Sequence, residues 1–447
     1  MNFDYDLFVI GAGPGGTAAA ERAATQGARV AIAERDRVGG NCVIHGCVPE
    51  KMMTYAARFS DLLKNADEYG WNKVSQQFDW SEFMRSRDKN IDHLSQVHKD
   101  HLKEAGVELI KGEAAFLDPH TIQVGDRKVS ADKILIAVGA SSVVPEITGI
   151  EYAITMRDLL DLEQPPKHLA IIGSNHIATK FAGILNELTC KVTQVAQEEY
   201  VLPDCDQDLR IAVQSGMTQQ GIRVLCNTQV ESIEKVQNGL NLTLVRDTKD
   251  TISVDTVAYV TERTANVDTL NLKAAGVEVQ QGMIAVDDNN RTSQPHIFAI
   301  GDCTHHLQWT PVAIAQGRAF ADTEFGGNPT TVSYGGIPYA VSTKPEAATI
   351  GLTEAQAREQ LGDSVLTYRK SFQPLFNLIG ESEEEAMLKL VVDKNTNRVL
   401  GAHMVGESAA EVIQMLAPAL KAGVMKQHFD NSLGIHPSVS EEFFTLR

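Results

Sequence analysis

A glycine-rich turn close to the start of the chain restricts its possible folds more than any other feature. The apolar run Leu7-Phe-Val-Ile10 leads into Gly11-Ala-Gly13-Pro-Gly-Gly16, an alanine-rich helical segment follows over 18–26, and a second apolar run over 28–34 ends in Glu34. In such a strand–helix–strand unit the glycines permit a tight turn, close approach of a pyrophosphate, and helix–strand contact, while the acid can hold ribose hydroxyls. The pattern predicts a doubly wound α/β fold with a dinucleotide at Gly11, Gly13, Pro14, Gly15, Gly16 and Glu34.

A pair of cysteines follows this unit. Cys42 and Cys47 lie in Gly39-Gly40-Asn41-Cys42-Val-Ile-His-Gly-Cys47-Val-Pro49, at the entrance of a helical, charged segment over 49–105. A cysteine pair in a reducing compartment is more often redox-active or metal-binding than structural. No second pair has zinc-site spacing, so we expect no metal. The pair and the glycine turn together predict a redox disulfide beside a flavin; a structural disulfide or two free thiols are the alternatives.

Composition excludes several classes of protein. The 447 residues carry 43% hydrophobic residues, six cysteines and a net charge of −18. An acidic surface repels nucleic acids and anionic membranes, so we expect neither as a partner. No apolar run approaches the roughly 20 residues that span a bilayer. The chain enters a strand almost at once, which leaves no room for a signal peptide and favours the cytoplasm. We expect Cys190, Cys205 and Cys226, which lie in or beside apolar segments, to be buried.

The rest of the chain repeats the nucleotide fold once. A strand over 168–173, a helix through 188 and a strand over 191–196 form a second unit, and Pro165-Pro166 ends an acidic connector before it. Another buried strand ends in Gly301-Asp302, and alternating strands with a helix over 407–422 occupy the C-terminal part. These motifs predict several domains, of which two bind nucleotides.

With these motifs the chain resembles the FAD-dependent pyridine-nucleotide disulfide oxidoreductases, and among them the glutathione reductases most closely. The resemblance covers essentially the whole length, and the redox segment and the tail His436-Pro-Ser-Val-Ser-Glu441 are its most specific motifs. It implies two doubly wound, Rossmann-like nucleotide-binding domains and a C-terminal α+β dimerisation domain. The implied boundaries are 1–150 for the FAD-binding domain, 151–270 for the NADPH-type domain, 271–335 for a central domain completing the FAD site, and 336–447 for the interface domain.

The resemblance also implies roles for individual residues. Cys42 would attack the substrate disulfide, Cys47 would be the thiol nearer the flavin, and His436 of the partner subunit, oriented by Glu441, would be the base of a homodimer with a shared active site. The chemistry needs these residue types, because only a thiolate attacks a disulfide and an imidazole held by a carboxylate can move its proton. Besides the glycine turn, the implied FAD contacts are Gly40, Asn41, Glu50, Lys51, Ala114, Gly139, Asp302 and Thr310.

The second nucleotide fold departs from the family pattern. Where the family has Gly-x-Gly-x-x-Gly/Ala, this chain has Gly173-Ser-Asn175-His176-Ile-Ala178, so Asn175 adds bulk where a pyrophosphate should approach. The segment after the next strand, Gln197-Glu198-Glu199, has no arginine for a 2′-phosphate, and Glu262 places a carboxylate near the expected nicotinamide path. We expect NADPH binding to be weakened or lost; the alternative is tolerated drift in a working site. The altered positions are Gly173, Asn175, His176, Lys180, Gln197 and Glu262.

A charge pair near the flavin has two interpretations. The family places a lysine at the start of the helix after the second cysteine and pairs it with an acid on the second fold's helix. Here those positions hold Glu50 and Lys180, which suggests a reversed pair that would shift the flavin potential. Alternatively, Lys51 keeps the family role and Lys180 is solvated.

The substrate positions are altered as well. Arg318 matches a family arginine that meets a substrate carboxylate, but Glu21, Pro14 and His98 replace other pocket residues. A dianionic disulfide would bind less well, so the substrate is expected to be a small disulfide or a disulfide on a protein. The sequence therefore predicts a disulfide reductase of the glutathione reductase type. The alternatives are a flavin-bearing redox sensor without nucleotide turnover and a dihydrolipoamide dehydrogenase-like enzyme.

Overall fold

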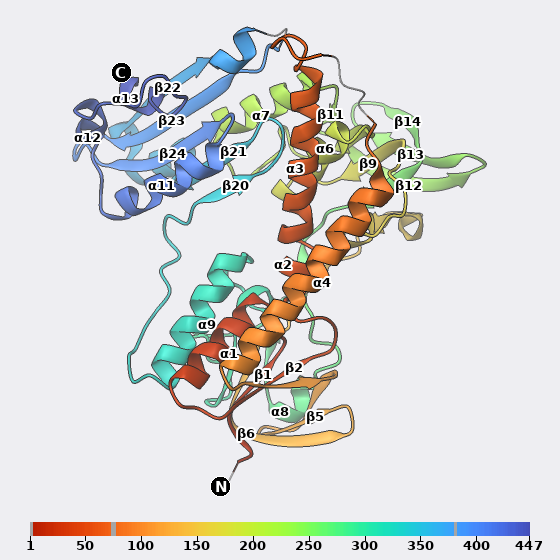
Figure 1. The fold of residues 1–447 in the computed structure, drawn as a ribbon, viewed down its shortest axis with the longest axis vertical. Helices are drawn as coiled ribbons and strands as arrows, with labels where there is room; N and C mark the ends of the chain where they lie inside the picture. The colour runs from red at the N-terminus through yellow and green to blue at the C-terminus, as the bar shows by residue number, and fades with distance from the viewer. Residues whose placement is uncertain (1–2, 73–76, 380–381) are drawn as a thin grey trace. The chain divides into compact units, whose positions relative to one another are not determined.

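The computed structural model describes residues 3–72, 77–379 and 382–447 (Figure 1). The chain forms two compact units, each assembled from separate segments. Unit 1 comprises Met1–Glu50, Ser81–Val143 and Thr261–Tyr334, and unit 2 comprises Lys51–Trp80, Val144–Val260 and Gly335–Arg447. Among the described residues, no helix is both long and apolar enough to cross a bilayer.

Unit 1 is built on a seven-stranded sheet. Its strand order is β3-β2-β1-β6-β5-β4, and β19 pairs with β6. The central strands run parallel, with Leu7 opposite both Val30 and Lys133, as expected for a doubly wound fold. The strands are β1 (Tyr5–Ile10), β2 (Val30–Glu34), β3 (Glu108–Lys111), β4 (Ala114–Asp118), β5 (Thr121–Val124), β6 (Arg127–Ile136) and β19 (Ile297–Ala299).

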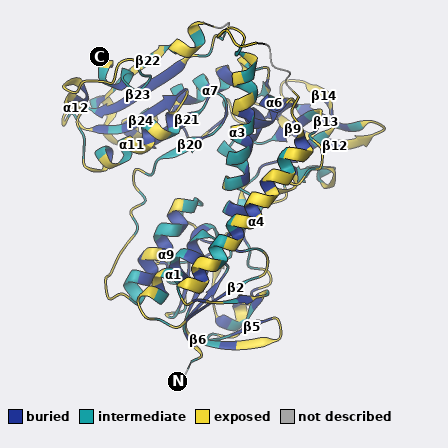
Figure 2. Ribbon diagram, viewed as in Figure 1, coloured by how far each residue is buried: buried dark blue, intermediate teal, exposed yellow. Residues whose placement is uncertain are grey.

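Three helices cover one face of this sheet: α1 (Pro14–Thr25), α4 (Trp80–Glu104) and α9 (Thr310–Glu324). Figure 2 shows the central strands of this sheet as largely buried and much of the surface of α4 as exposed. The backbones of α1 and α9 come into contact, because a Cβ at Gly317 would lie 2.4 Å from the Gly15 carbonyl oxygen. Helix α1 begins four residues earlier than the alanine-rich segment predicted, since Pro14 has its φ fixed at a helical value and needs no amide partner there.

Unit 2 contains the second nucleotide-type fold. The sheet of this fold has five strands, all parallel, in the order β11-β10-β9-β15-β8. The acidic connector that ends at Pro165-Pro166 supplies the edge strand β8 and the short helix α5, whose Thr155 and Asp158 form a capping box. The elements are β8 (Ile154–Thr155), α5 (Met156–Leu160), β9 (His168–Ile172), α6 (His176–Glu187), β10 (Lys191–Val195), α7 (Gln207–Gln219), β11 (Arg223–Leu225) and β15 (Thr256–Tyr259).

The C-terminal part of unit 2 is an antiparallel sheet covered by helix α11 (Ala409–Lys421). Helix α11 continues through Pro418, whose side of the helix is exposed. The predicted α+β architecture is confirmed, and the predicted burial of Cys190, Cys205 and Cys226 is also confirmed. The elements here are β20 (Tyr339–Val341), β21 (Ala347–Gly351), α10 (Glu354–Leu361), β22 (Val365–Phe372), β23 (Ala386–Asp393), β24 (Val399–Val405), α12 (Lys426–Asp430) and α13 (Glu442–Thr445).

A buried lysine joins this sheet to the second nucleotide-type fold. The Lys389 ammonium on β23 donates to Asp206 at 2.9 Å, to Asp208 at 2.6 Å and to Glu354 at 2.7 Å, and the Lys389 and Asp206 side chains are 2% and 1% exposed. Burial acts to lower the pKa of Lys389, but the hydrogen bonds to the three carboxylates outweigh it and raise that pKa. Asp206 also caps α7, so one ion cluster fixes a helix of one fold on the sheet of the other.

Lys389→Met tests this cluster. The variant should lose about 3–5 kcal/mol of unfolding free energy, because buried carboxylates are left without a counter-charge. The matched control is Lys249→Met, which removes an exposed lysine paired with Glu231 and should cost about 1 kcal/mol or less. Urea unfolding followed by far-ultraviolet circular dichroism measures both, and equal losses in the two variants would contradict the assignment.

Candidate active site

The glycine turn of unit 1 places backbone where side chains cannot fit. Gly11 has φ +104°, and a Cβ at Gly16 would lie 2.0 Å from the Gly11 carbonyl oxygen, so α1 rests directly on the end of β1. Gly13 caps α1 without a side-chain hydrogen bond, which leaves the first-turn amides available to a ligand. A Cβ at Gly13 would meet only the Gly40 Cα, at 3.8 Å.

Glu34 lies at the end of β2 and holds the same turn. Its carboxylate accepts hydrogen bonds from the backbone amides of Ala12 at 2.8 Å and Asp36 at 2.9 Å. The acid predicted to bind a ribose therefore also fixes the backbone between the first two glycines. Of the other residues expected to contact FAD in this part, Ala114 is buried at the start of β4, and Gly139 has φ +69° with its carbonyl accepting from the Asn266 amide.

The redox segment is attached to this turn through a second glycine. Gly39 and Gly40 have φ values of +120° and +59°, and a Cβ at Gly40 would lie 2.6 Å from the Gly13 Cα. Helix α2 (Gly40–Ile44) then carries Asn41 and Cys42, and Cys47 begins α3 (Cys47–Lys64). Only glycine fits at position 40, where the backbone touches Gly13. Because α2 begins at this contact, the two cysteines that follow lie next to the dinucleotide turn.

The structure brings Cys42, Cys47 and Thr310 together. Neither Cys42 nor Cys47 forms a disulfide in the described structure, and the Thr310 hydroxyl lies 3.7 Å from the Cys47 sulfur. The hydrogen bond that the Cys42 thiol donates to Cys47 raises the pKa of Cys42, and burial and the charge of Asp302 raise it further, against a lowering contribution from Thr310. Thr310 is the first residue of α9, and the side chain of the N-cap residue Trp309 does not cap the first-turn amides of this helix. The positive end of a 15-residue helix therefore lies at the sulfur pair.

Asp302 lies in the turn after β19 and is held by an arginine that the sequence interpretation did not single out. The Arg263 guanidinium donates to the Asp302 carboxylate at 2.6 Å and to the Ala140 carbonyl oxygen at 2.7 Å. Arg263 follows Glu262, which is exposed and lies in unit 1. The available signal was its place directly after Glu262, a residue interpreted only for nucleotide binding.

The tail brings His436 and Glu441 together. His436 Nδ1 lies 3.0 Å and 3.1 Å from the two Glu441 carboxylate oxygens, and Glu441 also accepts from the Ser438 amide at 3.2 Å. The Glu441 side chain is 20% exposed and the His436 side chain 83% exposed. Glu441 thus orients the ring through Nδ1 and leaves Nε2 available for proton transfer.

The loop of the second fold has the first glycine of the Gly-x-Gly pattern, Gly173, but has Asn175 in place of the second. Gly173 has φ +141°, and a Cβ there would lie 2.6 Å from the Val260 carbonyl oxygen. Asn175 is the N-cap of α6, and its side-chain oxygen accepts from the amides of Ile177 at 3.0 Å and Ala178 at 3.1 Å. Its φ of −71° and ψ of 176° are ordinary extended values.

The other altered positions lie on both units. His176 and Lys180 are on α6, and Gln197 is exposed just after β10. Glu50 is in unit 1 and Lys180 is in unit 2, so their reversed pairing stays a prediction. The Lys51 ammonium lies over the Tyr55 ring, 5.4 Å from its centroid.

The expected substrate positions lie on the helices that cover the first sheet. Pro14 and Glu21 are on α1, His98 is on α4, and Arg318 is on α9. Glu21 and Arg318 make no hydrogen bond or ion pair among the described residues. A carboxylate and a guanidinium are therefore both available to a bound molecule on this side of unit 1.

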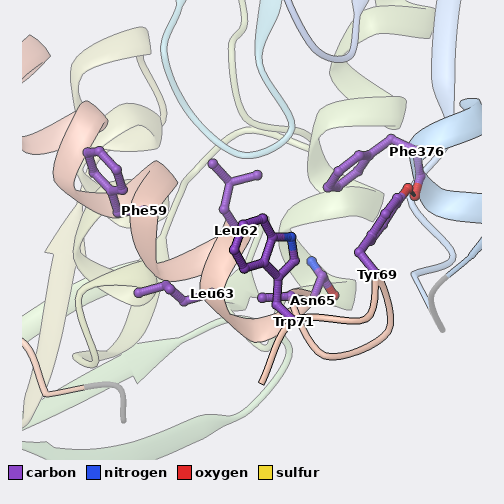
Figure 3. Close-up of a pocket in the computed structure, with 8 residues that line it drawn as sticks. Phe59, Leu62, Leu63, Asn65, Tyr69, Trp71 and Phe376 are labelled. Carbon is purple, nitrogen blue, oxygen red and sulfur yellow. Dashed lines mark hydrogen bonds between the residues drawn. The ribbon is translucent and has the colours of Figure 1, made fainter. Parts of the chain in front are cut away.

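Unit 2 also contains an apolar cavity of about 380 Å³. Figure 3 shows Phe59, Leu62 and Leu63 of α3 on one side and the paired rings of Tyr69 and Phe376 on the other. Those rings stack with centroids 5.2 Å apart, and the Tyr69 hydroxyl donates to the Phe376 carbonyl oxygen at 2.6 Å. The sequence interpretation did not identify this cavity, because one wall is supplied by Phe376, which lies far along the chain from the other lining residues.

Comparison with known proteins identifies the family. The family model described as pyridine nucleotide-disulphide oxidoreductase matches residues 5–317, and the model for its dimerisation domain matches 337–447. The chain belongs to the pyridine nucleotide-disulphide oxidoreductase family. As predicted, it is an FAD-dependent disulfide oxidoreductase, and its dimerisation domain makes it a homodimer.

Relatives within this family cover the whole chain. The chain is 49% identical to a glutathione reductase of Nostoc sp. over 459 residues, with 100% of both chains aligned. It is 42% identical to a glutathione reductase of Burkholderia cepacia, with 100% of this chain and 99% of that protein aligned. It is 39% identical to the chloroplastic/mitochondrial glutathione reductase of Pisum sativum, with 100% and 82% aligned.

The first fold of this oxidoreductase fits FAD. The uncapped first turn of α1, the open space beside Gly13 and the carboxylate of Glu34 together suit a pyrophosphate and a ribose. Asp302 and Thr310 would hold the flavin half, next to the sulfur pair.

Two alanine substitutions separate cofactor binding from folding. Gly13→Ala should fold, because its Cβ has room, but should retain less FAD, because the methyl group occupies the side on which the pyrophosphate would approach. Gly16→Ala should fail to fold stably, because its Cβ would clash with the Gly11 carbonyl oxygen. FAD content per protomer and thermal melting measure the two effects. Full FAD retention by Gly13→Ala would contradict this site.

Proposed function

We propose that this homodimer reduces a disulfide substrate of the glutathione type by exchange with the Cys42–Cys47 pair. The observation that carries the proposal is the cluster of Cys42, Cys47 and Thr310, which the Gly40–Gly13 contact holds beside the dinucleotide turn. Bound FAD would supply a redox group that accepts two electrons from a donor and passes them on to the sulfur pair. The names of the relatives support glutathione disulfide as the substrate to test first.

The sulfur chemistry follows from the geometry of the pair. The Cys42 thiolate attacks one substrate sulfur, a mixed disulfide forms, and the other substrate half leaves as a thiol after it gains a proton. Cys47 then attacks Cys42, which releases the second thiol and leaves a Cys42–Cys47 disulfide. Two electrons have then passed from the cysteine pair to the substrate, and the pair must be reduced again before the next cycle.

Proton transfer requires a base, because the pKa of Cys42 is raised above its usual range. Within the proposed shared site that base is His436 of the partner subunit, which Glu441 holds through Nδ1. Leu433 and Ile435, just before this histidine, are 97% and 81% exposed in the single chain. Apolar side chains so exposed in a dimerisation domain support contact with the second copy.

The electron donor is the feature in which we expect this protein to differ from its relatives. Asn175 occupies the first-turn amides of α6, and Gln197-Glu198-Glu199 offers no cation to a 2′-phosphate. We therefore propose weakened NADPH binding. The same observation favours a second candidate function, a flavin-bearing redox sensor that is reduced through thiols. We further propose a cytoplasmic location and a small or protein-borne disulfide.

Reaction of the reduced enzyme with disulfide tests the function without a nucleotide. Enzyme reduced with dithionite under argon should be reoxidised by glutathione disulfide, whereas Cys42→Ser should lose this reaction by at least about 10³-fold, because no attacking thiolate remains. Cys226→Ser, which changes a buried cysteine elsewhere, is the matched control. Reoxidation of Cys42→Ser at the wild-type rate would contradict the proposal.

His436→Gln should slow the same reaction by about 10²–10⁴-fold near pH 7, the usual contribution of a general base. The deficit should shrink as pH rises, because a larger fraction of a thiol with a raised pKa is then ionised by the solvent and needs no histidine to remove its proton. Stopped-flow rates from pH 6 to about pH 10 measure this trend. His93→Gln, at an exposed site on α4, should match the wild type, and a deficit that does not depend on pH would exclude the proton-transfer role.

A further inference from the structure

Asn175 places an oxygen acceptor where a dinucleotide would place its phosphates. Its side-chain oxygen accepts from the amides of Ile177 at 3.0 Å and Ala178 at 3.1 Å, in the first turn of a 12-residue helix. These amides have no partner within the helix, and they are the donors that a pyrophosphate uses in a Gly-x-Gly-x-x-Gly/Ala loop. The Asn175 side chain therefore satisfies the two amides that would otherwise bind the pyrophosphate.

The rest of the loop is built as a phosphate loop and is held in place. Gly173 keeps the positive φ of the tight turn, and the Leu202 amide donates to the Ser174 carbonyl oxygen at 2.7 Å. The buried Gln194 amide donates to the Gly173 carbonyl oxygen at 2.9 Å and lies 3.3 Å from the Thr179 hydroxyl. The turn at Gly173, helix α6 and the hydrogen bonds that hold them have the form expected of a dinucleotide-binding loop. The Asn175 cap is therefore a local departure from that form.

The backbone at position 175 also accepts other residues. Its φ of −71° and ψ of 176° are extended values that asparagine, aspartate and glycine all adopt without strain. Glycine is nearly as good as asparagine at an N-cap, because water can then reach the amides. Replacing Asn175 with glycine should therefore leave α6 folded and expose the same two amides to a ligand.

We infer, in an inference that rests on the proposed function, that Asn175 sets the dinucleotide affinity of the second fold: its side chain is an internal ligand that competes with the pyrophosphate of any nicotinamide dinucleotide. The competition acts on the group that NAD⁺ and NADP⁺ share. It is therefore separate from Gln197, Glu198 and Glu199, which act on the 2′-phosphate that only NADP⁺ carries. Asn175 lowers the affinity for both dinucleotides by the same factor, and the residues after β10 set the ratio between them.

Calorimetric titration of the oxidised FAD-loaded dimer with NAD⁺ and with NADP⁺ tests this inference, because neither ligand reacts with oxidised enzyme. Asn175→Gly should bind both ligands more tightly than the wild type, each by about 10-fold, a factor equal to about 1.4 kcal/mol. The ratio of the two dissociation constants should stay within about twofold of the wild-type ratio. Asn175→Asp is the matched control: it keeps an acceptor on the amides and adds a negative charge, so it should bind no more tightly than the wild type.

Equal affinities of Asn175→Gly and the wild type would overturn the inference, as would tightening for NADP⁺ alone. Far-ultraviolet circular dichroism and FAD content confirm that the variants are folded. The disulfide reaction of dithionite-reduced enzyme, which needs no nucleotide, should be the same in all three proteins. If none of the three proteins carries out this disulfide reaction, the proposed function is contradicted. The nucleotide affinities are measured separately, so they test the role of Asn175 whatever the outcome of the disulfide reaction.

Discussion

The contact between Gly13 and Gly40 is the constraint on which the active site depends. A single β-carbon at Gly40 would lie 2.6 Å from the Gly13 Cα, so the redox segment can reach the dinucleotide turn only as bare backbone. From that contact, α2 carries Cys42, α3 begins at Cys47, and the first residue of α9 adds the Thr310 hydroxyl. The sulfur pair and the FAD loop are therefore two parts of one backbone arrangement, and neither could move without the other.

The two nucleotide folds share an architecture and differ at the helix that should receive phosphate. In the first, Gly13 caps α1 without a side-chain bond and leaves the amides open. In the second, Asn175 closes the equivalent amides of α6 from within the chain. The difference needs no change in topology, because both folds keep parallel strands around the loop. One residue type at one position is enough to make the folds unequal in their affinity for a dinucleotide.

Local patterns in the sequence were sufficient to predict the two nucleotide-type folds, whereas the C-terminal α+β domain was implied by the resemblance to a known family. The strand over Tyr5–Ile10, the glycine turn and the second unit beginning at His168 follow from apolar runs and glycine spacing, which depend on neighbours along the chain. The adjacency of His436 and Glu441 followed from a resemblance to a known family and is present in the tail. That the two carboxylate oxygens both face one ring nitrogen is a detail that only the structure reveals.

Other parts of the site depend on contacts between distant segments. Arg263 meets Asp302 across 39 positions, and Lys389 gathers carboxylates from two folds, so no local pattern indicates either. Asn175 was recognised as a replaced glycine, but its role depends on where its oxygen points. A side chain predicted only to add bulk instead forms two hydrogen bonds, and this changes the expected defect from a steric block to a competition.

The electron capacity of the purified flavoprotein tests the central claim most directly. In an anaerobic dithionite titration, the wild type should take up two electrons more per FAD than the Cys42→Ser/Cys47→Ser variant, because a dithiol–disulfide couple stores two electrons. The extra uptake should be accompanied by the appearance of thiols that react with a thiol reagent. Equal uptake by the two proteins would show that these sulfurs exchange no electrons with the flavin, and would contradict a redox role for the pair.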